Sequence, residues 1–172
     1  AWFAGLPYVV DERVLVPRSP IAELIEKRFA PWLVNEPQKI LDLCTGSGCI
    51  GIACAHAFPD AEVQLSDISY DALAVAEENI RQHGMTERIF ALQSDLFDNL
   101  LGQRFDLIVS NPPYIRSEVV VGLEPEVTKF DPMDALDGGA DGLDAYRSIA
   151  AEALEHLKDQ GLVGLELPGR AG

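Results

Sequence analysis

A glycine-rich segment between a short apolar run and a stretch of small residues constrains the fold of this chain most. Residues 46–51 read Gly-Ser-Gly-Cys-Ile-Gly and follow the apolar run 39–43. This G-x-G-x-x-G spacing is typical of α/β sheets in which the backbone approaches a ligand and a helix N-terminus presents its N–H groups. The motif alone is a weak signal, because a tight strand-to-helix turn without a ligand has the same spacing.

Strand and helix patterns alternate along the chain. A helix of about a dozen residues is predicted after Ser19 as N-cap and Pro20 as its first residue. Residues 115–141 are expected to form a long functional loop. Alternation predicts an α/β fold with a mostly parallel, doubly wound sheet. The predicted strands are residues 39–43, 63–67, 89–92, 105–110 and 162–167. Besides the helix after Ser19, the predicted helices are residues 50–58, 70–83 and 143–158.

Charge and apolar content narrow the possible partners. The chain has 13 Lys and Arg residues against 28 Asp and Glu, a net charge of -15, which repels phosphate backbones and suits a basic protein partner. A nucleic acid is therefore not expected as the direct substrate. No apolar stretch reaches the roughly 18 residues of a membrane span, so we expect no membrane partner and a cytoplasmic location.

The cysteines and histidines suggest no metal site. Cys44, Cys49 and Cys54 recur at a spacing that fits neither a zinc pair nor a disulfide set, so they are expected to be reduced and buried. The alternative is a reactive thiol at Cys44 or Cys49, near a helix start. The three histidines are expected at the surface or at helix ends.

Acidic residues near the loop are candidate cofactor ligands. Asp67, at the end of the second strand, can accept both ribose hydroxyls, which suits NAD and S-adenosylmethionine equally. Asp42 favours S-adenosylmethionine, because a carboxylate there meets its amino group or an ordered water but repels a pyrophosphate. The alternative role of Asp42 is to bond the backbone N–H groups of the loop. Asp95 is expected at the adenine amino group and Leu96 over the ring, and the alternative for Asp95 is the N-cap of a helix over residues 96–101.

Asn111, Pro112, Pro113 and Tyr114 follow the predicted strand 105–110, where open parallel sheets bind their ligands. An amide nitrogen is a poor nucleophile because its lone pair is delocalised, so a site must orient its NH2 group. The Asn111 side-chain oxygen and the Pro112 carbonyl can each accept one N–H, and Tyr114 offers a face for stacking. The alternative is an Asn-Pro turn with a buried tyrosine.

These motifs together resemble the HemK-type protein-(glutamine-N5) methyltransferases over residues 5–166. The matching segments are residues 14–20, 42–48, 67–69, 111–114 and 135–143. The resemblance implies a class I S-adenosylmethionine-dependent methyltransferase fold, Rossmann-like, whose C-terminal hairpin is expected to lie outside this chain. It implies cofactor contacts at Cys44, Thr45, Gly46, Ser47, Gly48, Asp67, Ile68, Leu96 and Asn111, and substrate contacts at residues 111–114.

The resemblance also implies how the chain is divided into domains and which reaction it catalyses. Residues 1–18 are expected to be an N-terminal arm or hairpin, and residues 19–172 a catalytic domain truncated at both ends. The expected reaction methylates a glutamine amide of a translation protein and releases S-adenosylhomocysteine. Residues 14–20, with residues 42–44, resemble the branch that acts on a large-subunit ribosomal protein, and residues 130–147 resemble the branch that acts on peptide-chain release factors. The alternatives are an adenine-N6 or other exocyclic-amine methyltransferase of DNA or RNA, and an inactive binding module.

Overall fold

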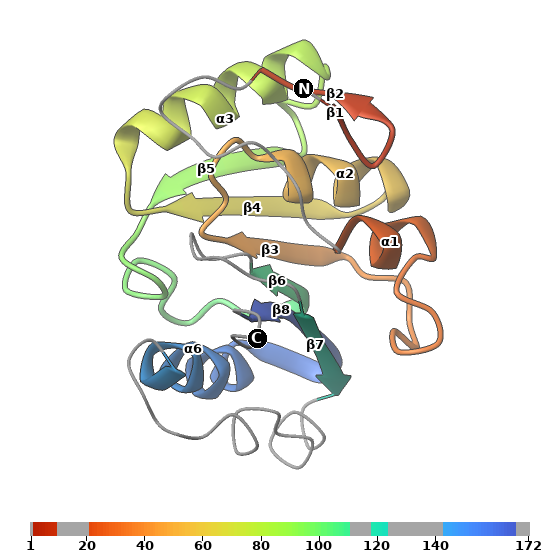
Figure 1. Cartoon of the computed structure of the whole chain (residues 1–172), viewed down its shortest axis with the longest axis vertical. Helices are drawn as coiled ribbons and strands as arrows, with labels where there is room; N and C mark the ends of the chain where they lie inside the picture. Colours follow the sequence, from red (N-terminus) through yellow and green to blue (C-terminus); the bar gives the residue numbers. More distant parts are fainter. Residues whose placement is uncertain (1, 10–20, 111–117, 124–142, 168–172) are drawn as a thin grey trace, which may run out of the picture.

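A six-stranded sheet forms the centre of the molecule (Figure 1). The computed structural model describes residues 2–9, 21–110, 118–123 and 143–167. The strand order is β5-β4-β3-β6-β8-β7, and every pairing is parallel except that of β7 with β8. The strands are β3 (Lys39–Leu43), β4 (Glu62–Asp67), β5 (Ile89–Gln93), β6 (Phe105–Ser110), β7 (Glu118–Leu123) and β8 (Leu157–Leu167).

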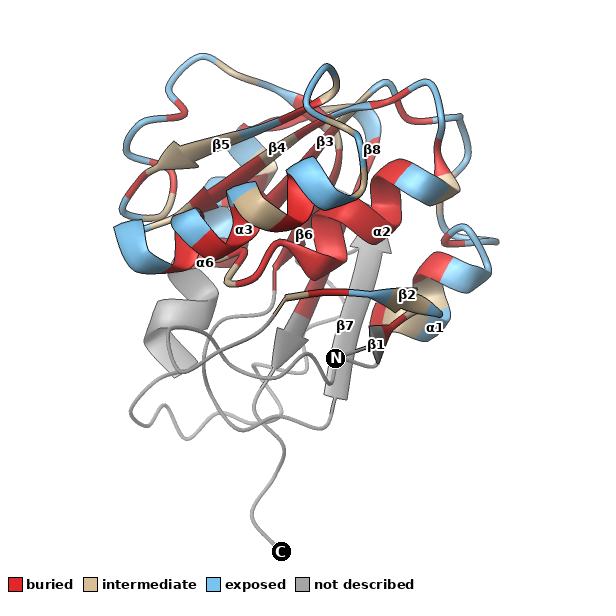
Figure 2. Cartoon of the chain, turned by 90° about the horizontal axis from the view of Figure 1, so that it is seen from above, coloured by how far each residue is buried: buried red, intermediate tan, exposed pale blue. Residues whose placement is uncertain are grey.

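Helices cover both faces of this sheet, as the alternating pattern predicts. The helices are α1 (Ile21–Glu26), α2 (Cys49–Ala57), α3 (Tyr70–Gln82) and α6 (Leu143–Glu155). Because successive strand residues point to opposite faces, Ile40 packs with α1, α2 and α3, whereas its neighbour Leu41 packs with α6. Figure 2 shows β3, β4 and β6 as mostly buried, α2 as buried over most of its length, and exposed residues on the outer side of α3. The doubly wound arrangement is confirmed.

The N-terminal residues form a small hairpin beside α2 and α3. Strands β1 (Trp2–Phe3) and β2 (Leu6–Pro7) pair antiparallel. Phe3 and Tyr8 are buried in the core cluster shared with α2 and α3. This segment is therefore packed against the domain. No helix in the described ranges is both long and apolar enough to cross a bilayer.

Strand β7 corrects the prediction of one uninterrupted loop over residues 115–141. Residues 118–123 read Glu-Val-Val-Val-Gly-Leu and pair antiparallel with β8, with Val120 opposite Leu165. Three consecutive valines have high strand propensity, and pairing with β8 satisfies the backbone groups on the side of β7 that faces it. The sheet therefore has a sixth, antiparallel edge strand that the sequence interpretation missed.

Helix α1 is shorter than the dozen residues predicted from apolar spacing. It ends at Glu26, because Arg28 and Phe29 have φ values of 54 and 58°, which no right-handed helix contains. Phe29 nevertheless lies fully buried against the sheet. The predicted cap, Ser19 with Pro20, lies outside the described residues.

Two other boundaries differ from the prediction. Helix α6 ends at Glu155 and β8 begins at Leu157, whereas the periodicity extended the helix to residue 158. A register shift between Phe105 and Leu107 of β6 accommodates the early start of β8.

Residues 96–99 form turns instead of the predicted short helix, and Leu96 has a φ of 53°. By contrast, α3 begins one residue after Ser69, whose Oγ accepts the N–H of Ala72 at 3.2 Å.

Candidate functional site

The carboxyl ends of three neighbouring strands meet beside the glycine loop. Leu43 of β3 is in register with Ser66 of β4 and with Ser110 of β6. The loop, residues 44–48, leaves β3 at this edge and enters α2. The N–H of Thr45 donates to the Ser66 carbonyl at 2.9 Å. The loop is therefore joined to β4 at its start, in the place where open parallel sheets bind ligands.

Asp42 is a buried carboxylate beneath this loop, with 1% of its surface exposed. Its Oδ2 accepts the Thr45 hydroxyl at 2.7 Å and the Gly51 N–H at 2.8 Å. Burial raises the pKa of Asp42 to about 7, opposed by these two hydrogen bonds and assisted by the charge of Asp67. Asp42 therefore has the alternative role expected from the sequence, in which its carboxylate accepts hydrogen bonds from the loop.

The second carboxylate oxygen of Asp42 is unused by the described part of the chain. Oδ1 is buried and has no hydrogen-bond partner among those residues. A buried acceptor without a donor is costly, so this oxygen remains suited to a donor from outside the protein. The predicted contact of Asp42 with a cofactor amino group stays a prediction.

Asp67 connects the loop to the start of α3. Its Oδ2 accepts the N–H of Gly46 at 2.9 Å, and its Oδ1 accepts the N–H of Ser69 at 2.9 Å. The side chain is only partly buried, and a carboxylate has about four acceptor positions. Asp67 therefore shapes the loop and keeps acceptor capacity for hydroxyl groups, a dual role that the sequence did not reveal.

Two glycines let the loop and α2 approach β4 closely. Gly48 has a φ of 85°, and a Cβ there would lie 3.2 Å from both Ala76 Cβ and Leu65 Cδ1. A Cβ on Gly51 would overlap the Leu65 side chain and lie 3.1 Å from Oδ2 of Asp42. These positions exclude side chains for packing reasons, independently of any ligand.

The other predicted cofactor-binding residues, Ile68, Asp95 and Leu96, follow the ends of β4 and β5. Ile68 is 59% exposed directly after Asp67. Asp95 is exposed and Leu96 partly buried. The turn that carries them is organised by Ser94, whose hydroxyl donates to the Leu96 carbonyl at 2.7 Å. Since no helix starts here, the N-cap alternative for Asp95 is wrong, and its contact with adenine stays a prediction.

The predicted substrate motif, Asn111 with Pro112, Pro113 and Tyr114, lies outside the described residues. The strand that leads into it is well anchored. Ser110 is buried, and its Oγ donates to the Leu43 carbonyl at 3.0 Å. This side-chain bond joins the ends of β6 and β3, so β6 ends at a fixed point beside the loop.

Two of the three cysteines are buried as predicted, whereas Cys44 is partly exposed and corrects the prediction for that position. Cys49 and Cys54 are buried, and burial raises the pKa of Cys49 to about 12 and that of Cys54 well above its ordinary value. The alternative of a reactive thiol is therefore wrong for Cys49, because its thiolate does not form near neutral pH. Cys44 is partly exposed at the start of the loop, with a φ of 61°.

Asn79 is a functional candidate that the sequence interpretation missed. It is fully buried on α3, and its Nδ2 donates to the Ser47 carbonyl in the middle of the loop at 2.8 Å. The available signal was its position, because Asn79 falls on the apolar face of the helix with Ala72, Ala76 and Ile80. A polar side chain on such a face needs a buried partner.

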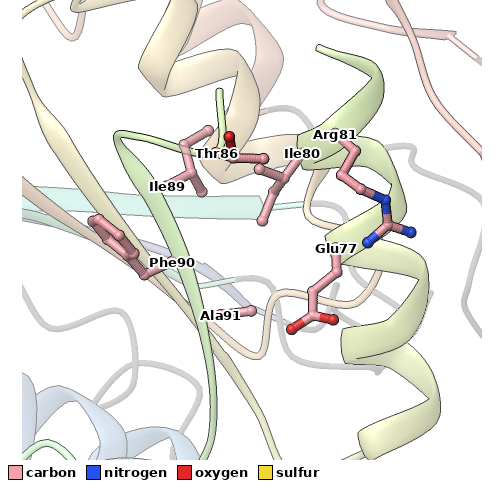
Figure 3. A pocket seen from close by; sticks show the side chains of 7 residues that line it. All are labelled: Glu77, Ile80, Arg81, Thr86, Ile89, Phe90 and Ala91. Carbon is pink, nitrogen blue, oxygen red and sulfur yellow. The ribbon is translucent and has the colours of Figure 1, made fainter. Parts of the chain in front are cut away.

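A separate hollow of about 340 Å³ lies between α3 and β5 (Figure 3). Glu77, Ile80 and Arg81 line it from the helix, and Ile89 and Phe90 line it from the strand. No loop residue contributes to it. The hollow is therefore distinct from the candidate site at the strand ends.

Comparison with known proteins gives related sequences over most of the chain. A family model described as "Methyltransferase small domain" matches residues 25–123. A "Ribosomal protein uL3 glutamine methyltransferase" of Francisella tularensis is 51% identical over 97% of this chain and 54% of its own length. A protein of the same name from Bradyrhizobium diazoefficiens is 46% identical over 93% of this chain and 52% of its own length. The chain thus spans about half the length of these curated relatives.

Solved structures share the fold at low sequence identity. A methyltransferase from Pyrococcus furiosus is similar over 96% of this chain and 71% of its own, with a TM-score of 0.66 and 22% identity. A type I restriction-modification methyltransferase subunit from Streptococcus thermophilus is similar over 89% of this chain and 34% of its own, with a TM-score of 0.60 and 20% identity. These likenesses confirm the expected Rossmann-like fold.

Proposed function

This chain belongs to the methyltransferase small domain family, and on that premise we propose that it methylates the side-chain amide of a glutamine in a ribosomal protein. The observation that carries the proposal is its 51% identity, over 97% of its length, with a uL3 glutamine methyltransferase. The sequence left a ribosomal protein and release factors open, and the names of the relatives favour uL3. The net charge of -15 suits a basic acceptor of this kind.

S-adenosylmethionine is the proposed donor, and the residues at the strand ends fit it. When bound, it supplies an electrophilic methyl group on a sulfonium centre. Asp67 keeps acceptor capacity for ribose hydroxyls beside its bonds to Gly46 and Ser69. The exposed side chain of Ile68 offers an apolar surface next to it. The unused Oδ1 of Asp42 is suited to a cationic or N–H group.

The loop, residues 44–48, and Leu96 complete the proposed cofactor site. Asp95 would hold the adenine amino group from its exposed position after β5. Thr45 and Gly46 are already held by Asp42 and Asp67, respectively. The site is therefore largely formed before any ligand binds, which lowers the entropic cost of binding.

Residues 111–114 are proposed to hold the acceptor amide. The Asn111 side-chain oxygen and the Pro112 carbonyl each accept one N–H, so the nitrogen lone pair is turned toward the methyl group. Pro113 restrains the backbone of these acceptors, and Tyr114 stacks on the planar amide. Nitrogen releases its proton to solvent after alkylation, so the site needs no strong base.

The proposal includes the organisation predicted from the sequence. Residues 1–18 form an arm and residues 19–172 the catalytic domain, and the protein acts in the cytoplasm. The packing of Phe3 and Tyr8 in the core supports an arm that is held against the domain.

Calorimetry and a methyl-transfer assay test the proposal. We expect the chain to bind S-adenosylmethionine, and labelled methyl groups to appear on a glutamine of purified uL3 and not on release factors or duplex DNA. Asn111→Ala is expected to abolish transfer, whereas the control Asn35→Ala, at an exposed asparagine, is expected to leave it intact. Failure to bind S-adenosylmethionine would contradict the cofactor. Cofactor binding with label on release factors alone would contradict the acceptor.

A further inference from the structure

Asn79 uses its whole side-chain amide in hydrogen bonds that are buried or partly buried. Its Oδ1 accepts the Val9 N–H at 2.5 Å, and its Nδ2 donates to the Val9 carbonyl at 3.0 Å. The same Nδ2 donates to the Ser47 carbonyl at 2.8 Å. One side chain of α3 therefore bonds two segments that are far apart in sequence, the end of the N-terminal hairpin and the glycine loop.

The hairpin segment, residues 3–9, is held along α3 at a second point. Nε2 of His83, the C-cap residue of α3, donates to the Pro7 carbonyl at 2.7 Å. The Tyr8 ring stacks on the His83 ring, with centroids 4.9 Å apart. The backbone of the segment is thus fixed on both sides of Tyr8, and Asn79 holds the side nearer the loop.

The bond to Ser47 fixes the orientation of one peptide group in the loop. The Ser47 carbonyl and the Gly48 N–H belong to the same rigid peptide plane. That N–H donates to the Thr45 carbonyl at 3.0 Å. A glycine adopts positive and negative φ with similar ease, so this bond to Thr45 is the restraint that the loop itself places on the peptide. Asn79 supplies a second restraint, on the carbonyl end of the same peptide, from outside the loop.

We propose that Asn79 is a positioning residue that couples the seating of the hairpin segment to the shape of the cofactor-binding loop. The inference rests on the proposed function for its effect on cofactor affinity. Release of Val9 leaves the side-chain oxygen of Asn79 and one of its two N–H groups without partners, so the buried amide is no longer held in the orientation that bonds Ser47. Seating of the hairpin therefore favours the loop conformation that binds the cofactor.

Three variants test this coupling. Asn79→Ala removes all three bonds, and Val9→Pro removes the Val9 N–H without altering α3. Ala74→Gly is the matched control, because it weakens the exposed side of α3 and touches neither the hairpin nor the loop. Hydrogen–deuterium exchange of loop amides is measured without cofactor, and the Kd for S-adenosylmethionine is measured by calorimetry.

We expect Asn79→Ala to speed exchange at residues 46–49 and to weaken cofactor binding about tenfold to hundredfold. Val9→Pro is expected to speed exchange in the same loop amides and to weaken binding about threefold to tenfold. Ala74→Gly is expected to stay within about twofold of the unmodified chain in affinity.

The inference is overturned if Val9→Pro leaves loop exchange unchanged, or if Ala74→Gly reproduces the changes caused by Asn79→Ala. Val9→Pro alone decides the matter if Asn79→Ala does not fold. If the unmodified chain binds no S-adenosylmethionine, the proposed function fails, while loop exchange in Val9→Pro still tests the coupling.

Discussion

Replacing Asp42 by asparagine should remove a pH dependence from the stability of this protein. Burial raises the pKa of the Asp42 carboxyl from 3.8 to about 7 in the folded chain. Between these pH values the folded state keeps a proton that the unfolded state has lost. Stability therefore falls as the pH rises through this window. The Asp42 carboxyl contributes most to the free energy of unfolding below about pH 4, and its contribution is lost above about pH 7.

The size of the effect follows from the two pKa values. A difference between 3.8 and about 7 corresponds to about 4 kcal/mol in the free energy of unfolding. Asparagine does not titrate, and its side-chain oxygen can still accept the Thr45 hydroxyl and the Gly51 N–H. The Asp42→Asn variant should therefore match the unmodified chain near pH 4 and exceed its stability by up to about 4 kcal/mol near pH 8.

Urea unfolding followed by circular dichroism measures this difference at pH values from about 4.5 to about 8.5. Other titrating groups contribute equally to both proteins and cancel in the difference. Asp60→Asn, which removes an exposed carboxylate, controls for the change in net charge. A stability difference between Asp42→Asn and the unmodified chain that stays constant over the whole pH range would refute the reasoning.

Three further outcomes follow from the same region. Gly51→Ala should lower the free energy of unfolding by about 1–3 kcal/mol, because the new Cβ overlaps a β4 side chain. Gly102→Ala, whose Cβ meets nothing within 4 Å, should lower it by only about 1 kcal/mol through backbone strain. Urea unfolding of both variants compares the two losses. Ser110→Ala should lose about 1 kcal/mol in the same assay, since the Leu43 carbonyl loses its donor, and an unchanged midpoint would contradict this. Binding of S-adenosylmethionine near pH 7 should release protons if its amino group meets Asp42, because a nearby cation lowers the pKa of a carboxyl; equal binding enthalpies in buffers of different ionisation enthalpy would exclude that contact.

The central βαβ units could be predicted from the sequence because local and long-range preferences agree there. Strand β6 occupies the residues that its apolar run indicated, and α3 starts after the capping residue Ser69. The glycine loop was recognisable because close packing on Leu65 and Asp42 demands residues without a Cβ at fixed positions. Each of these signals lies within about ten neighbouring residues.

The parts that were missed depend on partners far away in the chain. The valine run of β7 becomes a strand because β8 pairs with it, and neighbouring prolines disguised that preference. The bond between Asn79 and Ser47 joins residues 32 positions apart, and that between Asn79 and Val9 joins residues 70 apart. Only the folded packing of α3 against the loop reveals such contacts.

The central place of β3 separates two tasks within one sheet. Its β4 side supplies Asp67 and Ile68, whereas the residues proposed to hold the acceptor begin where β6 ends on its other side. On the proposed function, mutations that change the acceptor can accumulate beyond β6 while the proposed cofactor contacts on the β4 side stay unchanged. A protein with this strand order could then change the molecule that it methylates without rebuilding the proposed site for its methyl donor.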